Sequence, residues 1–291
     1  MKRSRRGERD LDSLPTSELA RLPLSQVIDE PAEPMLKFAV RFCLVLLRLT
    51  KPEWHHREKV PRTGGVVFAV NHTSNADPLA YGHFLVYAGR WPRFLAKDAI
   101  FRVPVLGFVA SRAGQIRVRR NSDTAHEAAA ASVEAVRQGK AVTVYPEGTI
   151  TGDPLGWPMN PKTGAARIAL ESGCPVVPIA QWGSQEILPG KKLTWPRLLP
   201  RKTMKVIAGD PVPLDDLRAR EHTPDVVAEA GERIIAAVTE LVGELRGETP
   251  PATRWDRKAG TRVPPLWPGK YQNTVDDGTT GVLPARDEEG R

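Results

Sequence analysis

Between Val66 and Arg246 short apolar runs alternate with helical stretches, and this alternation restricts the possible folds more than any other feature. The runs are rich in β-branched residues and have the length of strands: VVFAV, QIRV, AVTVY, PVVPIA and MKVIAG. Helical periodicity is clearest in the stretches between and after them, namely Ser122–Gln138, Thr163–Ser172 and Thr223–Arg246. Strands and helices in this order predict a single α/β domain with a mostly parallel central sheet flanked by helices.

The two ends of the chain lack this pattern. Residues 1–33 are charged and interrupted by prolines, and residues 247–291 are dense in turn residues without apolar periodicity. We therefore expect two flexible tails, 1–33 and 247–291, around one domain over residues 34–246. We find no internal repeat, which argues against a solenoid.

The first apolar stretch, residues 35–51, is predicted to be an amphipathic helix. On a helix its cations fall within a stripe of roughly 80°, and apolar residues cover the rest; the cations are Lys37, Arg41, Arg48 and Lys51. Such a helix either packs half-buried against its own domain or lies in a membrane interface with its cations toward phosphate headgroups. The absence of acidic residues from the stripe favours an interface helix on an anionic membrane. The cations also interrupt the run before the roughly 20 residues that a spanning helix needs.

A net charge of +8 favours polyanionic partners: nucleic acid, an anionic leaflet or a phosphorylated substrate. Nucleic acid is disfavoured, because no binding motif occurs and the arginines lack interleaved aromatic residues outside the carboxyl-terminal segment. The two cysteines, Cys43 and Cys174, form neither a disulfide framework nor a metal-ligand pattern, and we expect them to be reduced. The basic start has no apolar run behind it, so the expected location is cytoplasmic and peripheral on the inner face of the cell membrane.

The strand VVFAV runs directly into NHTSNADP, where His72 and Asp77 are candidates for acid–base chemistry. Asp77 before Pro78 has the form of a helix cap, which by itself is a structural feature. If His72 lies in the turn, however, the carboxylate of Asp77 can fold back and accept a hydrogen bond from its ring. Such a pair forms a general base, because the carboxylate orients the imidazole and stabilises the imidazolium. Histidine, with a pKa of about 6.5, is well matched to this role.

A second strand, Ala141–Tyr145, also ends in a polar cluster, Pro146–Thr149. The carboxyl ends of parallel strands lie on one rim of the sheet, where α/β domains bind ligands, so we expect the two clusters to be neighbours. Gly148 permits close approach of a ligand, and Glu147 and Thr149 can bind polyol hydroxyl groups. Taken alone, this sequence is more often an ordinary β-turn.

Together these blocks resemble the glycerolipid acyltransferase family, typified by lysophosphatidic acid acyltransferase (1-acylglycerol-3-phosphate O-acyltransferase). NHTSNAD is similar to the family's N-H-x-x-x-x-D block, and YPEGT is similar to F-P-E-G-T-R. GQIRVRR resembles G-x-I-x-I-x-R, and CPVVPIA resembles the V-x-P-V/I segment. The stretch FLAKDAIFRVPVLG also fits, and the resemblance covers residues 35–213.

The resemblance implies an enzyme that moves a fatty acyl group from acyl-CoA or acyl carrier protein to the free hydroxyl of the lysophospholipid 1-acylglycerol-3-phosphate, giving phosphatidic acid. It implies that His72 is the base and that Asp77 orients it, with no cofactor and no metal. It further implies substrate contacts from Glu147, Gly148, Thr149, Arg120, Lys97 and Lys162. A covalent intermediate on Ser74 is disfavoured, because the chain lacks a G-x-S-x-G elbow.

One position departs from the family pattern: Ile150 stands where the third block normally ends in arginine. Lys162, Arg119 or Arg117 can replace the missing phosphate contact, and Lys162 precedes a predicted helix whose amino end attracts anions. The departure keeps open a different acceptor, such as the hydroxyl of a glycolipid or a lyso-aminolipid. A non-enzymatic membrane adaptor would need residues 35–51 but not His72.

Overall fold

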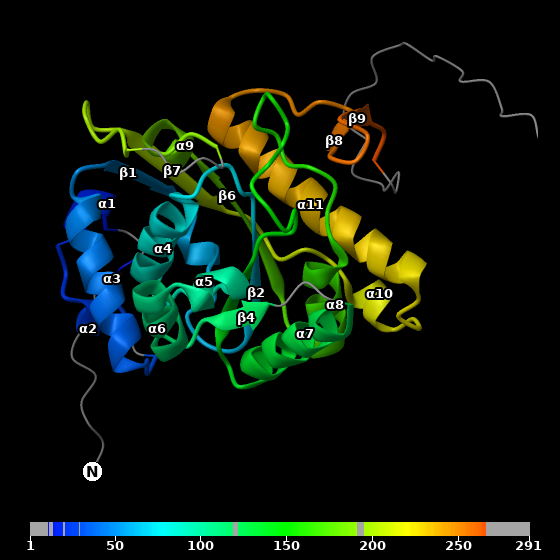
Figure 1. Ribbon diagram of the computed structural model, residues 1–291, viewed down its shortest axis with the longest axis horizontal. Helices are drawn as coiled ribbons and strands as arrows, with labels where there is room; N and C mark the ends of the chain where they lie inside the picture. Colours follow the sequence, from blue (N-terminus) through cyan, green and yellow to red (C-terminus); the bar gives the residue numbers. More distant parts are fainter. Residues whose placement is uncertain are drawn as a thin grey trace, which may run out of the picture.

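The computed structural model describes residues 11, 14–19, 21–28, 30–118, 122–190 and 195–265. Its centre is a five-stranded sheet in the order β1–β7–β6–β2–β5 (Figure 1). Neighbouring strands pair in parallel, except that β6 and β7 are antiparallel. The predicted, mostly parallel sheet is confirmed, with the strands β1 (Lys51–His55), β2 (Val66–Val70), β5 (Ala141–Val144), β6 (Val176–Trp182) and β7 (Thr203–Ala208).

Helices cover both faces of this sheet, and the side chains of β2 show why. Val66, Phe68 and Val70 join a core shared with α3 (Pro34–Leu47) and α4 (Asp77–Tyr87). Val67 and Ala69, which point the opposite way, join a core shared with α7 (Ser122–Arg137), α8 (Thr163–Ser172) and α11 (Pro224–Arg246). Successive residues of a strand alternate between its faces, so a fully apolar strand requires helices on both sides.

The long helices end where their sequence signals predict. Thr223 caps α11 by accepting a hydrogen bond from the backbone N–H of Val226, and Gly247 follows the helix with a φ of 65°. Gly173 ends α8 with a φ of 69°. Glycine occupies this left-handed region at little cost, so it is the usual residue at such helix ends.

The predicted strand QIRV forms outside the central sheet. Its residues Ile116–Val118 are β4, which pairs in parallel with β3 (Leu95–Lys97). An isolated bridge from Phe94 to Thr143 connects this small sheet to the edge of β5. Between β3 and β4 lie two helices, α5 (Asp98–Arg102) and α6 (Pro104–Arg112).

The prediction of a flexible tail over residues 1–33 is wrong for its described part. Two short helices, α1 (Thr16–Leu19) and α2 (Leu24–Val27), bury Leu19 and Val27 in the core beside α4. Glu30 then forms ion pairs with the buried Arg90 and Arg93. Glu30 and Glu33, two of the charges that suggested a solvated segment, are therefore paired with buried arginines; residues 1–10 lie outside the described part.

The predicted tail over residues 247–291 is also wrong up to residue 265. A hairpin of β8 (Arg254–Asp256) and β9 (Thr261–Val263) packs beside α11 (Figure 1). Ion pairs fasten it, from Arg262 to the buried Asp153 and from Arg254 to Glu232. The remaining short elements are a 3₁₀ turn (Arg57–Lys59), α9 (Ser184–Ile187) and α10 (Asp215–Arg218); residues 266–291 lie outside the described part.

Candidate active site

Asn71 joins the ends of two neighbouring parallel strands, β2 and β6. Its side-chain amide donates to the carbonyl oxygen of Gln181 at 3.0 Å and accepts from the Gln181 backbone N–H at 2.8 Å. The side chain of Gln181 in turn donates to the Asn71 carbonyl oxygen at 3.0 Å. These buried side-chain bonds take the place of backbone hydrogen bonds at the ends of the two strands. The next residue, His72, therefore lies at the rim of the sheet.

The predicted hydrogen bond between His72 and Asp77 is present. Nδ1 of His72 lies 2.8 Å from Oδ2 of Asp77, whose side chain is fully buried, whereas the His72 side chain is 15% exposed. With Nδ1 donating to the carboxylate, Nε2 is the nitrogen free to accept a proton. The pair therefore has the arrangement of a general base.

Asp77 is not the cap predicted from its position before Pro78. Helix α4 already begins at Asp77, and the carboxylate turns back onto the loop, where Oδ2 accepts from the backbone N–H groups of Thr73 and Ser74. Oδ1 accepts from the hydroxyl groups of Thr73 and Ser184. Together with His72, five donors converge on this one buried carboxylate and fix its orientation.

Ser74 is committed to structural hydrogen bonds. Its hydroxyl lies 2.7 Å from the carbonyl oxygen of Leu188 and 3.2 Å from that of Ser184, and it accepts from the backbone N–H of Ala76. The residue is fully buried. A hydroxyl with these contacts is not placed to attack a thioester, in agreement with the low expectation for a covalent intermediate.

Two residues at the end of β5 position His72. The ring of Tyr145 stacks on the imidazole with 4.1 Å between the ring centroids and 16° between the planes. Glu147 accepts a hydrogen bond from the backbone N–H of His72 at 3.0 Å, and the backbone N–H of Thr151 donates to the His72 carbonyl oxygen at 2.7 Å. The two rim clusters expected to be neighbours thus touch through His72.

Glu147 does not face the cavity, contrary to the prediction that it contacts the acceptor. Its side chain is buried, and its second oxygen accepts from the backbone N–H of Met159 at 3.0 Å. Burial raises the pKa of this carboxyl to about 8, against the opposing effect of the N–H groups of Met159 and His72. Glu147 therefore links the turn after β5 to the loops on either side of it.

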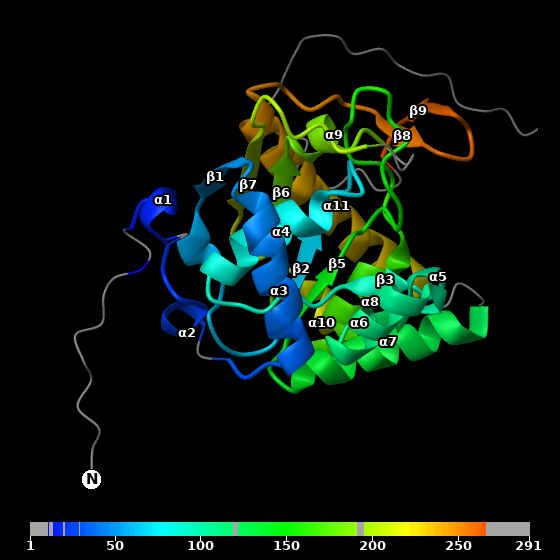
Figure 2. The same ribbon diagram turned by 60° about the vertical axis from the view of Figure 1, so that its left-hand side comes forward.

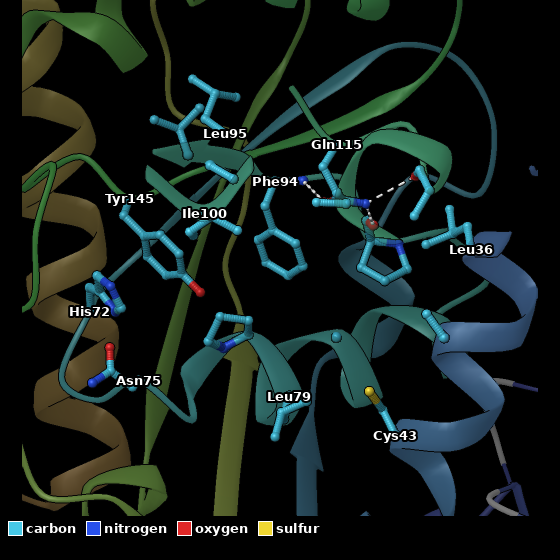
Figure 3. A pocket seen from close by; sticks show the side chains of 18 of the residues that line it. Leu36, Cys43, His72, Asn75, Leu79, Phe94, Leu95, Ile100, Gln115 and Tyr145 are labelled. Carbon is cyan, nitrogen blue, oxygen red and sulfur yellow. Dashed lines mark hydrogen bonds between the residues drawn. The ribbon is translucent and has the colours of Figure 1, made fainter. Parts of the chain in front are cut away.

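An apolar cavity of about 580 Å3 opens beside His72 (Figure 3). Its walls are formed by α3 and α6 on one side and by α4 with the end of β5 on the other. Apolar side chains predominate, among them Leu36, Leu44, Leu79, Phe94, Leu106 and Val109. The volume lies in the range of small-ligand sites, ~300–1,000 Å3.

Polar groups lie near the His72 end of this cavity. Gly148 and Thr149 line it, and so does Lys162, whose backbone N–H donates to the carbonyl oxygen of Pro146 at 2.7 Å. The Lys162 side chain is exposed and immediately precedes α8, so its charge and the helix amino terminus act on the same region. Cys43 lines the apolar part, and burial raises the pKa of its thiol.

The other predicted contacts are described only in part. Arg120 and Arg119 lie outside the described residues, as does the side chain of Lys97, whose backbone ends β3. Arg117 stacks over Phe101 and lies 3.6 Å from a carboxylate oxygen of Asp98. The side chain of Ile150 is buried and does not line the cavity. In the described part of the chain, no three His, Cys, Asp or Glu side chains converge as a metal site would require.

Sequence reasoning missed Ser184 and the stacking role of Tyr145. Ser184 follows the end of β6 by two residues, and β6 runs parallel to β2, so its loop reaches the same rim. The carboxyl ends of parallel strands lie on one rim of the sheet, which predicted that Pro146–Thr149 lies near His72. The same argument predicts that the loop after β6 lies near His72. For Tyr145 the signal was its place as the last residue of a predicted strand, immediately before the polar turn.

The chain is similar to known acyltransferases. Residues 51–182 match the model of the family described as Acyltransferase. Over 124 residues the chain is 33% identical to 1-acyl-sn-glycerol-3-phosphate acyltransferase BAT2, chloroplastic, of Brassica napus, covering 42% of this chain and 34% of that protein. Over 133 residues it is 31% identical to the 1-acyl-sn-glycerol-3-phosphate acyltransferase of Borreliella burgdorferi, covering 44% and 49%. The match thus spans half or less of these relatives.

The fold is similar to that of a solved structure. The 1-acyl-sn-glycerophosphate (LPA) acyltransferase PlsC from Thermotoga maritima superimposes with a TM-score of 0.55 at 20% identity. The alignment covers 76% of this chain and 81% of that one. At this level of identity the likeness concerns the fold, a central sheet flanked by helices.

Proposed function

Residues 51–182 match the model of the acyltransferase family, and from this match we propose that the chain transfers a fatty acyl group from a thioester to a hydroxyl group of a glycerolipid. The observation that carries the proposal is His72, hydrogen-bonded to a buried carboxylate at the end of an apolar cavity. As acceptor we propose 1-acylglycerol-3-phosphate, the substrate class in the names of the relatives. The donor is acyl-CoA or an acylated carrier protein.

The reaction needs one base and no enzyme nucleophile. Nε2 of His72 removes the proton of the acceptor hydroxyl as its oxygen attacks the thioester carbonyl carbon. The tetrahedral intermediate collapses, the C–S bond breaks, and the leaving thiolate takes the proton from the imidazolium. Asp77 holds the ring by Nδ1 throughout and stabilises its positive charge. Transfer of one proton in each direction leaves His72 ready for the next cycle.

The cavity supports an acyl ligand because its walls are apolar and its polar groups lie at the reacting end. An acyl chain between α3 and α6 would leave its carbonyl carbon beside His72. Burial against Leu36, Leu44 and Val109 would favour the bound chain over the aqueous one, at ~0.8 kcal/mol per buried CH2 group. Lys162 would attract the phosphate of the acceptor.

The buried Ile150 favours a second acceptor class. An apolar side chain that points into the core supplies no phosphate contact at the position of the family arginine. An uncharged acceptor, such as a glycolipid or lyso-aminolipid hydroxyl, would not need that contact. The two acceptor classes are therefore alternatives for the same base and the same cavity.

We place the protein peripherally on the cytoplasmic face of the membrane. Two of the helices that line the cavity, α3 and α6, expose apolar side chains: Phe38 and Phe42 on α3 are 65% and 60% exposed, and Val105 on α6 is 78% exposed. Exposed apolar groups beside cations suit the interface of an anionic leaflet. Among the described helices, none is long and apolar enough to cross a bilayer.

The test is turnover by purified protein with labelled acyl-CoA and a panel of lipid acceptors. Wild-type protein should give phosphatidic acid from lysophosphatidic acid. His72→Ala should lower kcat by about 10²–10⁴-fold, the usual contribution of a general base, at an unchanged melting temperature. His222→Ala, a substitution of an exposed histidine, serves as the matched control and should keep wild-type turnover.

Different outcomes reject different parts of the proposal. Unchanged turnover in His72→Ala would reject the base. Turnover of a glycolipid or lyso-aminolipid, without product from lysophosphatidic acid, would replace the acceptor but keep the chemistry. Absence of thioester consumption with every acceptor, by protein that is folded, would reject acyl transfer.

A further inference from the structure

A second pocket lies next to the apolar cavity beside His72, which we call the acyl cavity, and Leu44, Leu47 and His83 line both. Its volume is about 970 Å3, and it is bounded by the α1–α2 turn, α3, the start of β1 and the segment before β7. Figure 2 shows α3 with α1 and α2 on one side and α6 on the other. The proposed acyl transfer makes no use of this pocket.

The pocket is strongly basic. Five cations line it, namely Arg21, Arg41, Arg48, Lys51 and Arg201, and none of the described lining residues is acidic. The side chains of the first four make no hydrogen bond or ion pair within the described part of the chain. Arg201 differs, because its guanidinium donates to the carbonyl oxygens of Arg48 and Thr50 at the end of α3. Like charges collected in a concave site raise the local positive potential, which favours an anion there.

The same pocket has an apolar side. Leu22, Leu24, Leu44 and Leu47 line it alongside the cations. A small inorganic anion would leave these groups in contact with water, whereas a ligand with an anionic head and an apolar body would cover both kinds of surface. Glycerophospholipids with a net negative charge have this chemistry.

The position of the pocket on α3 fits a lipid that comes from a bilayer. At about 100° per residue, Phe38, Phe42, Val45 and Leu49 form one exposed stripe. Arg41 and Arg48 point about 80° to one side of its centre, whereas Ala39 and Cys43, which line the acyl cavity, point to the other side. Leu44 and Leu47, on the buried side of the helix, line both pockets. If the stripe enters the interface, the basic pocket opens at the depth of the phosphate groups.

We propose that this pocket binds one anionic glycerophospholipid by its phosphate, as a site separate from the acyl cavity. The inference rests on the proposed function only in taking a membrane as the source of the ligand; the pocket does not need His72. Binding there would hold α3 at the membrane and keep the mouth of the acyl cavity toward the lipid. The site is specific for net negative charge, because a choline headgroup would place a cation among cations.

The experiment is calorimetric titration of the full-length protein with dihexanoyl-phosphatidylglycerol below its micelle concentration. Dihexanoyl-phosphatidylcholine and inorganic phosphate are titrated in parallel. Wild-type protein should bind one phosphatidylglycerol at least 10-fold more tightly than either. Arg41→Gln/Arg48→Gln should weaken that binding by about 30-fold, the effect of two cations at a lipid surface. Arg257→Gln/Lys258→Gln removes the same charge from the β8–β9 turn and should change binding less than twofold.

Two further variants separate this site from the catalytic one. His72→Ala should bind phosphatidylglycerol as wild type does, so failure of the acyl-transfer proposal leaves this result intact. Ala39→Phe, which narrows the acyl cavity, should also keep the binding. Equal affinity for inorganic phosphate and phosphatidylglycerol would show that the pocket recognises phosphate alone, and would overturn the proposal of a lipid ligand. Binding that survives in Arg41→Gln/Arg48→Gln, or is lost in Ala39→Phe, would overturn the proposal.

Discussion

His72 is held by groups from its own turn and from the turn that follows β5. Asp77 accepts from its ring, Glu147 accepts from its backbone N–H, and Tyr145 stacks on the face of its imidazole. Asp77 itself receives a hydrogen bond from Ser184, which is 107 residues away in the sequence. The orientation of the imidazole therefore depends in part on Asp77, Glu147 and Ser184, which are buried and do not line the cavity.

Ser184→Ala tests this dependence at the residue scale. Loss of one donor to the Asp77 carboxylate should lower kcat about 10-fold, with KM nearly unchanged, because ring orientation and not substrate binding is affected. The measurement is kcat and KM from steady-state kinetics with a soluble acyl-CoA, together with the melting temperature.

The conservative variant Ser184→Thr should restore most of the activity, and Ser111→Ala, at an exposed serine on α6, should resemble wild type. A lower melting temperature in Ser184→Ala with an unchanged kcat would show that Ser184 only stabilises the fold.

At the scale of elements, α3 is the helix that combines most roles. One side packs in the core through Leu36 and Val40, which also line the acyl cavity. Another side is exposed and apolar, and a third carries Arg41 and Arg48 into the basic pocket. The two interpretations of residues 35–51, a half-buried helix and an interface helix, are therefore compatible, because each describes a different side.

Ala39→Phe is expected to shorten the acyl chain that the enzyme accepts. Ala39 lines the cavity from α3, and an aromatic ring there would occupy space that a long chain needs. With equal amounts of C12 and C18 acyl-CoA, the C12 product should gain at least fivefold relative to wild type. Ala39→Ser, which adds little volume, is the control; an unchanged product ratio in Ala39→Phe would place the acyl chain elsewhere.

Phe38→Ser/Phe42→Ser should weaken binding to phosphatidylcholine vesicles about 10-fold or more. Both side chains are mostly exposed and line neither pocket, so their removal takes away apolar contact with lipid and leaves both sites intact. Vesicle sedimentation measures the effect. Leu155→Ser, at a 62% exposed position on a loop that Arg246 of α11 contacts, is the control and should bind vesicles as wild type does. If the double variant sediments with vesicles as much as wild type, this face of α3 does not bind the membrane.

At the scale of the whole molecule, the free energy of unfolding should fall as the pH rises from about 5 to 8. In this range Glu147 is protonated in the folded state but ionised in the unfolded state. Its folded pKa is about 8, above the ordinary value of 4.5, so the native state binds the extra proton between these values. Between pH 5.5 and pH 8.5 the ionisation of Glu147 should therefore lower the free energy of unfolding by about 3 kcal/mol. Glu147→Gln lacks this titration and should lose less stability over the same range.

Urea unfolding of both proteins at the two pH values measures the difference. Glu147→Gln is expected to be less stable than wild type at pH 5.5. The two Glu147 oxygens accept from the backbone N–H groups of His72 and Met159, and in the variant the NH2 group of the amide would face one of these donors. Equal pH dependence in the two proteins would show that other groups dominate.

The sequence by itself determined the order and type of the long elements and the contact between His72 and Asp77. Periodicity, helix caps and glycine stops are local signals, and the two side chains are only five residues apart in one turn. Tertiary structure alone decided the inward direction of Glu147, the bond from Ser184, the packed hairpin after α11 and the convergence of five cations beside α3. Each of these features depends on which distant segments of the chain pack together and which charges they bury. Such long-range contacts produce no periodic pattern in the sequence from which they could be predicted.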